Sequence, residues 1–73
     1  MPLKLTLRSR DILRKLSHLG FMQDRMTGSH VILYEPQTGR RAVVPRHNSE
    51  LPKGTVKSII REARIELDDF WNA

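Results

Sequence analysis

The sequence predicts an α+β fold in which two helices flank three short strands, in the order α-β-β-β-α. Apolar residues recur with helical spacing near both ends of the 73-residue chain, and the segment between them alternates apolar runs with turn signals. The connections between the strands are short, which implies an antiparallel meander. A three-stranded antiparallel sheet covered on one face by the two helices is therefore expected.

The first helix is expected to begin near Ser9, whose hydroxyl makes it a suitable N-cap residue. Apolar side chains then occupy one helical face, at Ile12, Leu13, Leu16 and Leu19. Gly20 supplies a C-terminal stop, because glycine readily adopts the positive φ with which helices end.

Three strands are expected in the middle of the chain. The first, residues 21–27, is polar and ends at the turn signal Gly28-Ser29. The second, residues 30–34, is rich in β-branched and aromatic side chains. A turn over residues 35–39 leads to the third strand, residues 40–44, which ends at Pro45 because proline cannot donate to a strand ladder.

The second helix is expected to start near Thr55, after a polar loop over residues 46–54. Its apolar face comprises Val56, Ile59, Ile60 and Ala63. The tail remains apolar at Leu67, Phe70 and Trp71. Because the chain has no internal repeat or linker, residues 1–73 are interpreted as a single domain.

Charge and composition restrict the class of partner. The net charge is +5, of which residues 1–61 carry +8 and residues 62–73 carry −3. A basic body suits a polyanion, because phosphates neutralised by Lys and Arg release counterions; a basic surface without a ligand is the alternative. No apolar run is long enough for a signal peptide or a membrane span, so a cytoplasmic protein with no membrane contact is expected.

Cofactor and metal sites are not expected. The chain has no cysteine, which excludes disulfides and thiolate ligands. The histidines and carboxylates lack ligand spacing, and no glycine-rich nucleotide-binding motif is present.

The three histidines are the main candidates for chemistry. His18 lies on the polar side of the first helix and is expected to be a solvated surface residue. His30 follows Gly28 and Ser29 at the start of the second strand, and an imidazole can give and take the protons that RNA cleavage requires. A structural role remains the alternative for His30, and His47 is either an accessory acid/base group, a phosphate donor or a loop cap.

Six basic side chains near the turns and loops are candidate contacts for RNA phosphates: Arg25, Arg40, Arg41, Arg46, Lys53 and Lys57. Ordinary solubilising charge is the alternative for each of them. Because Arg40 and Arg41 are adjacent in a strand, they point to opposite faces, and at most one of them serves any one sheet surface.

An ordered set of motifs resembles the HicA-type toxins, also called the YcfA-like family. The motifs are Gly20-Phe21, Gly28-Ser29-His30, Pro36, Gly39-Arg40-Arg41, Val44-Pro45-Arg46-His47, Glu50-Leu51, and Lys53-Gly54-Thr55 with Ile59. The resemblance covers residues 9 to about 65 and leaves residues 66–73 as a C-terminal extension. It implies a fold like a double-stranded RNA-binding domain and a metal-independent endoribonuclease that cleaves mRNA and blocks translation.

The resemblance also assigns roles within a type II toxin–antitoxin system. The histidine of the Gly-Ser-His motif is the catalytic residue of the family and corresponds to His30, with Gly28 and Ser29 as possible accessory residues. A HicB-type antitoxin would be the protein partner and would cover the active site. A non-catalytic RNA-binding module, or a domain that binds an acidic protein, remains the alternative.

Two features depart from the family pattern. Arg64 stands where the family commonly has a glycine that ends the second helix, so residues 65–71 either prolong that helix or form a short added turn. The turn over residues 35–39 is one residue longer than usual.

Overall fold

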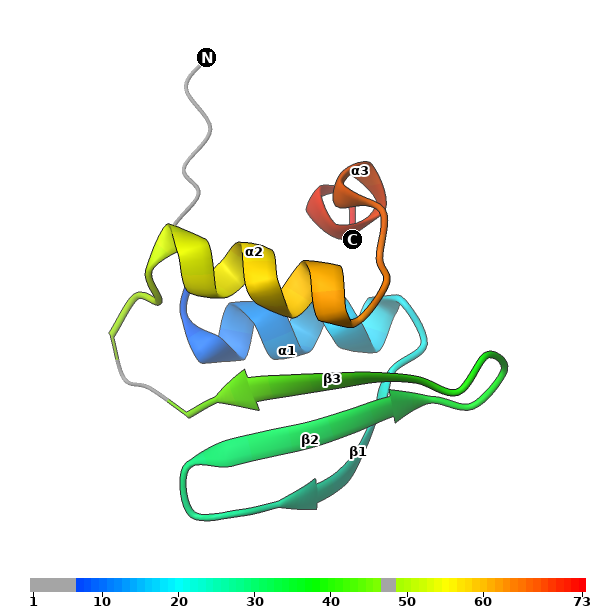
Figure 1. The fold of residues 1–73 in the computed structure, drawn as a ribbon, viewed down its shortest axis with the longest axis horizontal. Coiled ribbons are helices and arrows are strands. Elements are labelled where there is room, and N and C mark those ends of the chain that lie inside the picture. Colours follow the sequence, from blue (N-terminus) through cyan, green and yellow to red (C-terminus); the bar gives the residue numbers. More distant parts are fainter. Residues whose placement is uncertain (1–6, 47–48) are drawn as a thin grey trace.

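The computed structural model describes residues 7–46 and 49–73 and confirms the expected fold. The helices and strands follow in the order α1 (Ser9–His18), β1 (Met22–Met26), β2 (His30–Glu35), β3 (Arg40–Pro45), α2 (Lys53–Glu62) and α3 (Leu67–Trp71) (Figure 1). The strands form one antiparallel sheet in the order β1-β2-β3. Both α1 and α2 pack on the same face of this sheet, mainly over β3.

The sheet has one covered and one open face, which follows from the two-residue period of its strands. Val31 and Leu33 of β2, with Ala42 and Val44 of β3, point toward the helices and are buried. The intervening residues face away from the helices and are more exposed: Ile32, Tyr34 and Val43. All five residues of β1 are exposed, so this edge strand is poorly covered on both faces.

The start of α1 differs from the sequence-based expectation, because Ser9 is the first helical residue and Arg8 occupies the N-cap position. The Asp11 carboxylate accepts a hydrogen bond from the Arg8 backbone N–H at 3.0 Å. The Ser9 hydroxyl donates instead to the Pro45 carbonyl, which ties the start of α1 to the end of β3. A partner distant in sequence therefore overrides the local preference of serine for capping.

The connection from α1 to β1 contains Gly20 in the positive-φ conformation (φ 95°) expected of a helix stop. Phe21 follows it and is buried, so it belongs to the core and precedes β1 by one residue. A β-bulge between Gln23 and Arg25 interrupts the pairing of β1 with β2.

The turn between β2 and β3 is organised by the buried carboxylate of Glu35. It accepts hydrogen bonds from the backbone N–H groups of Gln37 at 2.6 Å and Thr38 at 3.1 Å, and from the Thr38 hydroxyl. These bonds, led by that of the hydroxyl and joined by the charge of Arg40, lower the pKa of Glu35 although burial opposes them. The Glu35 carboxylate thus holds the turn together through several hydrogen bonds.

The tail forms a separate short helix and does not prolong α2. Arg64 follows the C-cap residue of α2, Ala63, and adopts a left-handed conformation (φ 56°) that ends this helix before α3. This conformation explains why glycine suits the position. α3 packs on α1, where Phe70 is completely buried and the Lys15 ammonium lies 5.7 Å from the ring centroids of both Phe70 and Trp71. The extension therefore contributes to the core.

Candidate functional site

The Gly28-Ser29-His30 segment forms the tight connection between β1 and β2. Thr27 closes it, because its backbone N–H donates to the His30 carbonyl at 2.9 Å and its hydroxyl oxygen accepts from the His30 N–H at 3.0 Å. Sequence reasoning missed Thr27, although threonine hydroxyls commonly bond to the backbone of turns. The backbone of His30 is consequently held at both of its polar groups.

The His30 ring is exposed at the first position of β2. Its Nδ1 lies 2.9 Å from the Ser29 hydroxyl oxygen. His30 pairs with Pro45, and the strand alternation places it on the open face of the sheet with Ile32 and Tyr34. Within the described part of the chain no other group bonds to the ring, which leaves Nε2 accessible to a substrate.

Ser29 can stabilise either protonation state of this ring. Its hydroxyl can donate to an unprotonated Nδ1 or accept from a protonated one. Nε2 can correspondingly carry a proton or present a lone pair. The pair can therefore give or take a proton at Nε2 while the ring keeps its orientation.

The end of β3 and the segments that lead into α1 and α2 come together at the end of the sheet where the Gly28-Ser29-His30 turn lies. The Arg46 backbone N–H donates to the Ser29 carbonyl at 2.8 Å, and the Ser9 hydroxyl joins the preceding Pro45 carbonyl to α1. An isolated bridge between Leu7 and Leu51 connects the segments that lead into α1 and α2. Both helices consequently begin at the end of the sheet that carries His30 (Figure 1). Helix N-termini carry partial positive charge, so this end favours anions.

Of the predicted phosphate contacts, Arg46, Lys53 and Lys57 lie on segments at this end of the fold and are exposed. Arg25 is an exposed residue of β1 that pairs with Ile32. The expectation for His47 lies outside the described residues.

Arg40 and Arg41 lie toward the opposite end of β3, since Arg40 pairs with Glu35 whereas Pro45 pairs with His30. At ~3.3 Å per residue, five residues of strand separate these pairs by roughly 17 Å. Arg40 donates to the Arg64 carbonyl at 3.1 Å and stacks on Phe21, with its Cζ 5.4 Å from the ring centroid. Arg41 lies 3.7 Å from the Asp24 carboxylate on the open face. The structure therefore gives both arginines contacts within the fold and does not group them with His30.

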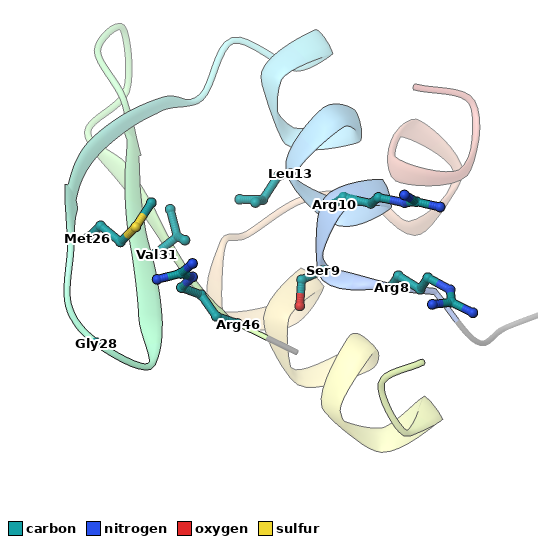
Figure 2. A pocket seen from close by; sticks show the side chains of 8 residues that line it. All are labelled: Arg8, Ser9, Arg10, Leu13, Met26, Gly28, Val31 and Arg46. Atoms are coloured by element: carbon teal, nitrogen blue, oxygen red, sulfur yellow. The ribbon is translucent and has the colours of Figure 1, made fainter. Parts of the chain in front are cut away.

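A pocket of about 630 Å³ lies beside the same turn, on the face of the sheet that the His30 ring does not share (Figure 2). Its lining residues are Arg8, Ser9, Arg10, Leu13, Met26, Gly28, Val31 and Arg46. Sequence reasoning missed Arg8 and Arg10, because only the packing of α1 against the sheet makes the start of α1 part of this pocket.

A metal site and a membrane span each make specific demands on the described residues. Across residues 7–46 and 49–73, no three His, Asp or Glu side chains lie together in a group that could hold a metal ion. None of the helices in these ranges is both long and apolar enough to cross a membrane.

A profile of a protein family described as the HicA toxin of bacterial toxin–antitoxin systems matches residues 9–65. The chain belongs to the HicA toxin family. It is thus a toxin of a toxin–antitoxin system, and a cognate antitoxin is its partner. Curated proteins contain no match to this HicA sequence. The match ends at the residue that follows Arg64, so α3 lies outside it.

Proposed function

We propose that this HicA toxin is an endoribonuclease that cleaves mRNA in the cytoplasm and so blocks translation, with His30 as its catalytic residue. The observation that carries the proposal is the exposed His30 imidazole, anchored through Nδ1 by Ser29 at the basic end of the fold. Toxins of this family are generally ribonucleases, which supports the same assignment.

The proposed reaction uses the 2′-hydroxyl of the RNA and requires no metal. The 2′-oxygen loses a proton and attacks the neighbouring phosphorus, and the bond from phosphorus to the 5′-oxygen breaks as that oxygen gains a proton. His30 Nε2 either takes the first proton or supplies the second. Arg25 pairs with Ile32 and so lies on the open face of the sheet that carries His30, which makes it a candidate to stabilise the charge that develops on the phosphate.

The proposed partner is a HicB-type antitoxin that covers His30. The open face of the sheet carries two exposed apolar residues, Met22 at 55% and Val43 at 45% exposure, and His30 belongs to the same face. A protein that docks on this face would bury His30 together with them. The basic end of the fold would attract an acidic partner and speed the encounter.

The test compares His30→Ala with His18→Ala, because both residues are exposed histidines and only His30 lies in the proposed site. Purified proteins are assayed for RNA cleavage in EDTA, and the same chains are induced in bacteria to measure growth. Loss of a general acid or base is expected to slow cleavage by ~10²–10⁴-fold in His30→Ala and to relieve the growth arrest. His18→Ala should behave as the wild type.

Circular dichroism and thermal unfolding would verify that His30→Ala remains folded, which is expected because His30 is exposed. A folded His30→Ala protein that cleaves RNA at the wild-type rate would contradict the assignment. Growth arrest without cleavage would favour the alternative in which the toxin blocks translation by binding RNA alone.

A further inference from the structure

We propose that the pocket between α1 and the β1–β2 turn binds one unpaired nucleotide of the RNA, adjacent to the nucleotide on which His30 acts. The inference rests on the proposed function, because it takes RNA as the ligand. It assigns a role to Arg8, Arg10 and Met26, which neither the sequence motifs nor the proposed reaction uses.

The lining of the pocket combines the two chemical features of a nucleotide. Leu13, Met26 and Val31 supply an apolar surface on which the face of a base can lie. Arginines supply cations for phosphates, and among the described residues that line the pocket none is acidic. A phosphate ion alone would leave the apolar surface unused, and an uncharged apolar ligand would leave the arginines unused.

The arrangement of the arginines favours a chain of phosphates over a single anion. Arg46 points across the pocket toward Met26 and Val31, whereas Arg8 and Arg10 extend outward from the start of α1 (Figure 2). These guanidinium groups do not converge on one point. Successive phosphates could instead meet the Arg46 cation inside the pocket and the Arg8 and Arg10 cations beyond the start of α1.

Gly28 provides an independent argument for a ligand at the turn. Its backbone φ angle is not positive, and a Cβ atom built on it would have no neighbouring atom within 4 Å. The fold therefore does not require glycine at this position. An RNA strand that runs from the pocket to the His30 ring must pass over this turn, and a glycine permits the close approach that a side chain would obstruct.

The pocket predicts single-stranded RNA as the substrate, although the fold resembles a double-stranded RNA-binding domain. The faces of a base within a duplex are covered by its stacked neighbours. Only an unpaired base can lay a face on the apolar surface of the pocket. An unpaired segment can also bend around the turn toward His30.

Two methionines of β1 provide a matched test. Met26 and Met22 have similar exposure, 53% and 55%, but Met26 pairs with Val31 beside the pocket and Met22 pairs with Tyr34 on the open face. Binding of a fluorescent single-stranded oligoribonucleotide with 2′-O-methyl sugars, which cannot be cleaved, is measured on the full chain. Met26→Ser is expected to weaken binding by about 5- to 10-fold, as for loss of a stacking surface, and Met22→Ser by less than about twofold.

A second pair of variants tests the charge and the turn. Arg46→Gln is expected to weaken binding by about tenfold at low salt, whereas Arg61→Gln, an equal change of charge near the C-terminal end of α2, should have little effect. Gly28→Gln should weaken binding without lowering the melting temperature, because its side chain enters open space.

The proposal is overturned if the two methionine variants bind RNA equally, or if a duplex of the same sequence binds as tightly as the single strand. It is also overturned if Met26→Ser weakens only the complex with the antitoxin, since the pocket would then belong to the protein partner. Binding is read independently of cleavage. If His30→Ala still cleaves RNA while Met26→Ser alone fails to bind, the catalytic assignment fails and the pocket stands.

Discussion

The Ser29 hydroxyl lies 2.9 Å from Nδ1 of His30 and therefore determines how the ring presents Nε2. Ser29 does not need to touch RNA for this role; it acts as a positioning residue. Without the hydroxyl, the ring would rotate more freely and spend less time in the reactive orientation.

Ser29→Ala is therefore expected to lower kcat by about tenfold with little change in KM, because orientation affects the reaction more than binding. Ser29→Thr retains a hydroxyl and should recover most of the rate. Steady-state cleavage kinetics on a defined RNA would measure both. An equal loss in the two variants would indicate that the size of the side chain matters and the hydroxyl does not.

The lowered pKa of Glu35 predicts how the free energy of unfolding depends on pH. Its pKa in the folded protein is below the ordinary value of 4.5, so the protein is stabilised by the carboxylate above that pH. The stabilisation is lost as the pH falls below 4.5 through the lower pKa of the folded state. Glu35→Gln should thus unfold more easily than the wild type at pH 7, and the difference should shrink in acid.

Urea unfolding at pH 7 and at about pH 3 would test this expectation, because the unfolding free energy follows from the midpoint and slope. Glu62→Gln, a change at an exposed glutamate of α2, is the control and should have little effect at either pH. A constant difference between Glu35→Gln and the wild type across this range would contradict the role given to the ionised carboxylate.

The sequence predicted the positions of some individual residues correctly and those of others wrongly. The position of His30 at the start of a strand followed from the turn signal before it, and the structure places it there. Ser9 was wrongly predicted as the N-cap, because its hydroxyl bonds to Pro45, 36 residues away in sequence. Contacts between residues far apart in sequence also define the pocket, so Arg8 and Arg10 could not be found from local patterns.

At the scale of the elements, the junction between α2 and α3 stores backbone strain at Arg64. A non-glycine residue in the left-handed conformation costs roughly 1–2 kcal/mol, because its Cβ approaches the carbonyl oxygen. Arg64 has φ 56°, and its own carbonyl accepts from Arg40 irrespective of the side chain at this position. Glycine would relieve the strain and keep this hydrogen bond.

Arg64→Gly is expected to stabilise the protein by about 0.5–1 kcal/mol, since greater freedom of the unfolded chain offsets part of the gain. In a domain of this size, that raises the melting temperature by roughly 2–8 °C. Arg61→Gly, within α2, is the control and should destabilise by about 1 kcal/mol. A lower melting temperature for Arg64→Gly would show that the arginine side chain contributes more than its backbone conformation costs.

The sequence predicted the order and approximate bounds of the main elements, because their apolar periodicity is strong. It left the tail undecided between a longer helix and an added turn, since both keep Leu67, Phe70 and Trp71 apolar. The left-handed Arg64 decides between them and directs Phe70 into the core against α1. The start of α2 at Lys53, two residues before the expected Thr55, reflects the limited precision of boundaries read from a pattern.

For the molecule as a whole, charge is separated between its parts. The starts of α1 and α2, the β1–β2 turn and the end of β3, which Arg46 follows, lie at one end of the fold (Figure 1), whereas four carboxylates are concentrated in residues 62–73. This asymmetry would orient the toxin relative to RNA before contact, because potentials act over about a Debye length.

RNA binding should consequently weaken steeply as salt increases. Neutral variants of Arg46 and Lys53 should each reduce the slope of the logarithm of affinity against the logarithm of salt by about one. The sequence alone led us to expect the same of Arg40, but its contacts with Arg64 and Phe21 make Arg40→Gln the control for the slope. Titrations between 50 and 200 mM salt, an interval over which phosphate contacts lose much of their affinity, would measure it. An equal reduction by Arg40→Gln would remove the distinction between the two ends.

Because β1 is exposed on both of its faces, its two methionines can serve as built-in probes for oxidative footprinting. Met22 and Met26 present thioethers to solvent on opposite sides of one strand, and exposed thioethers are readily oxidised to sulfoxides. A short peroxide pulse followed by peptide mass spectrometry would report the protection of each sulfur separately. Protection of Met26 by RNA and of Met22 by the antitoxin would reveal which side each ligand covers, without a label or a substitution.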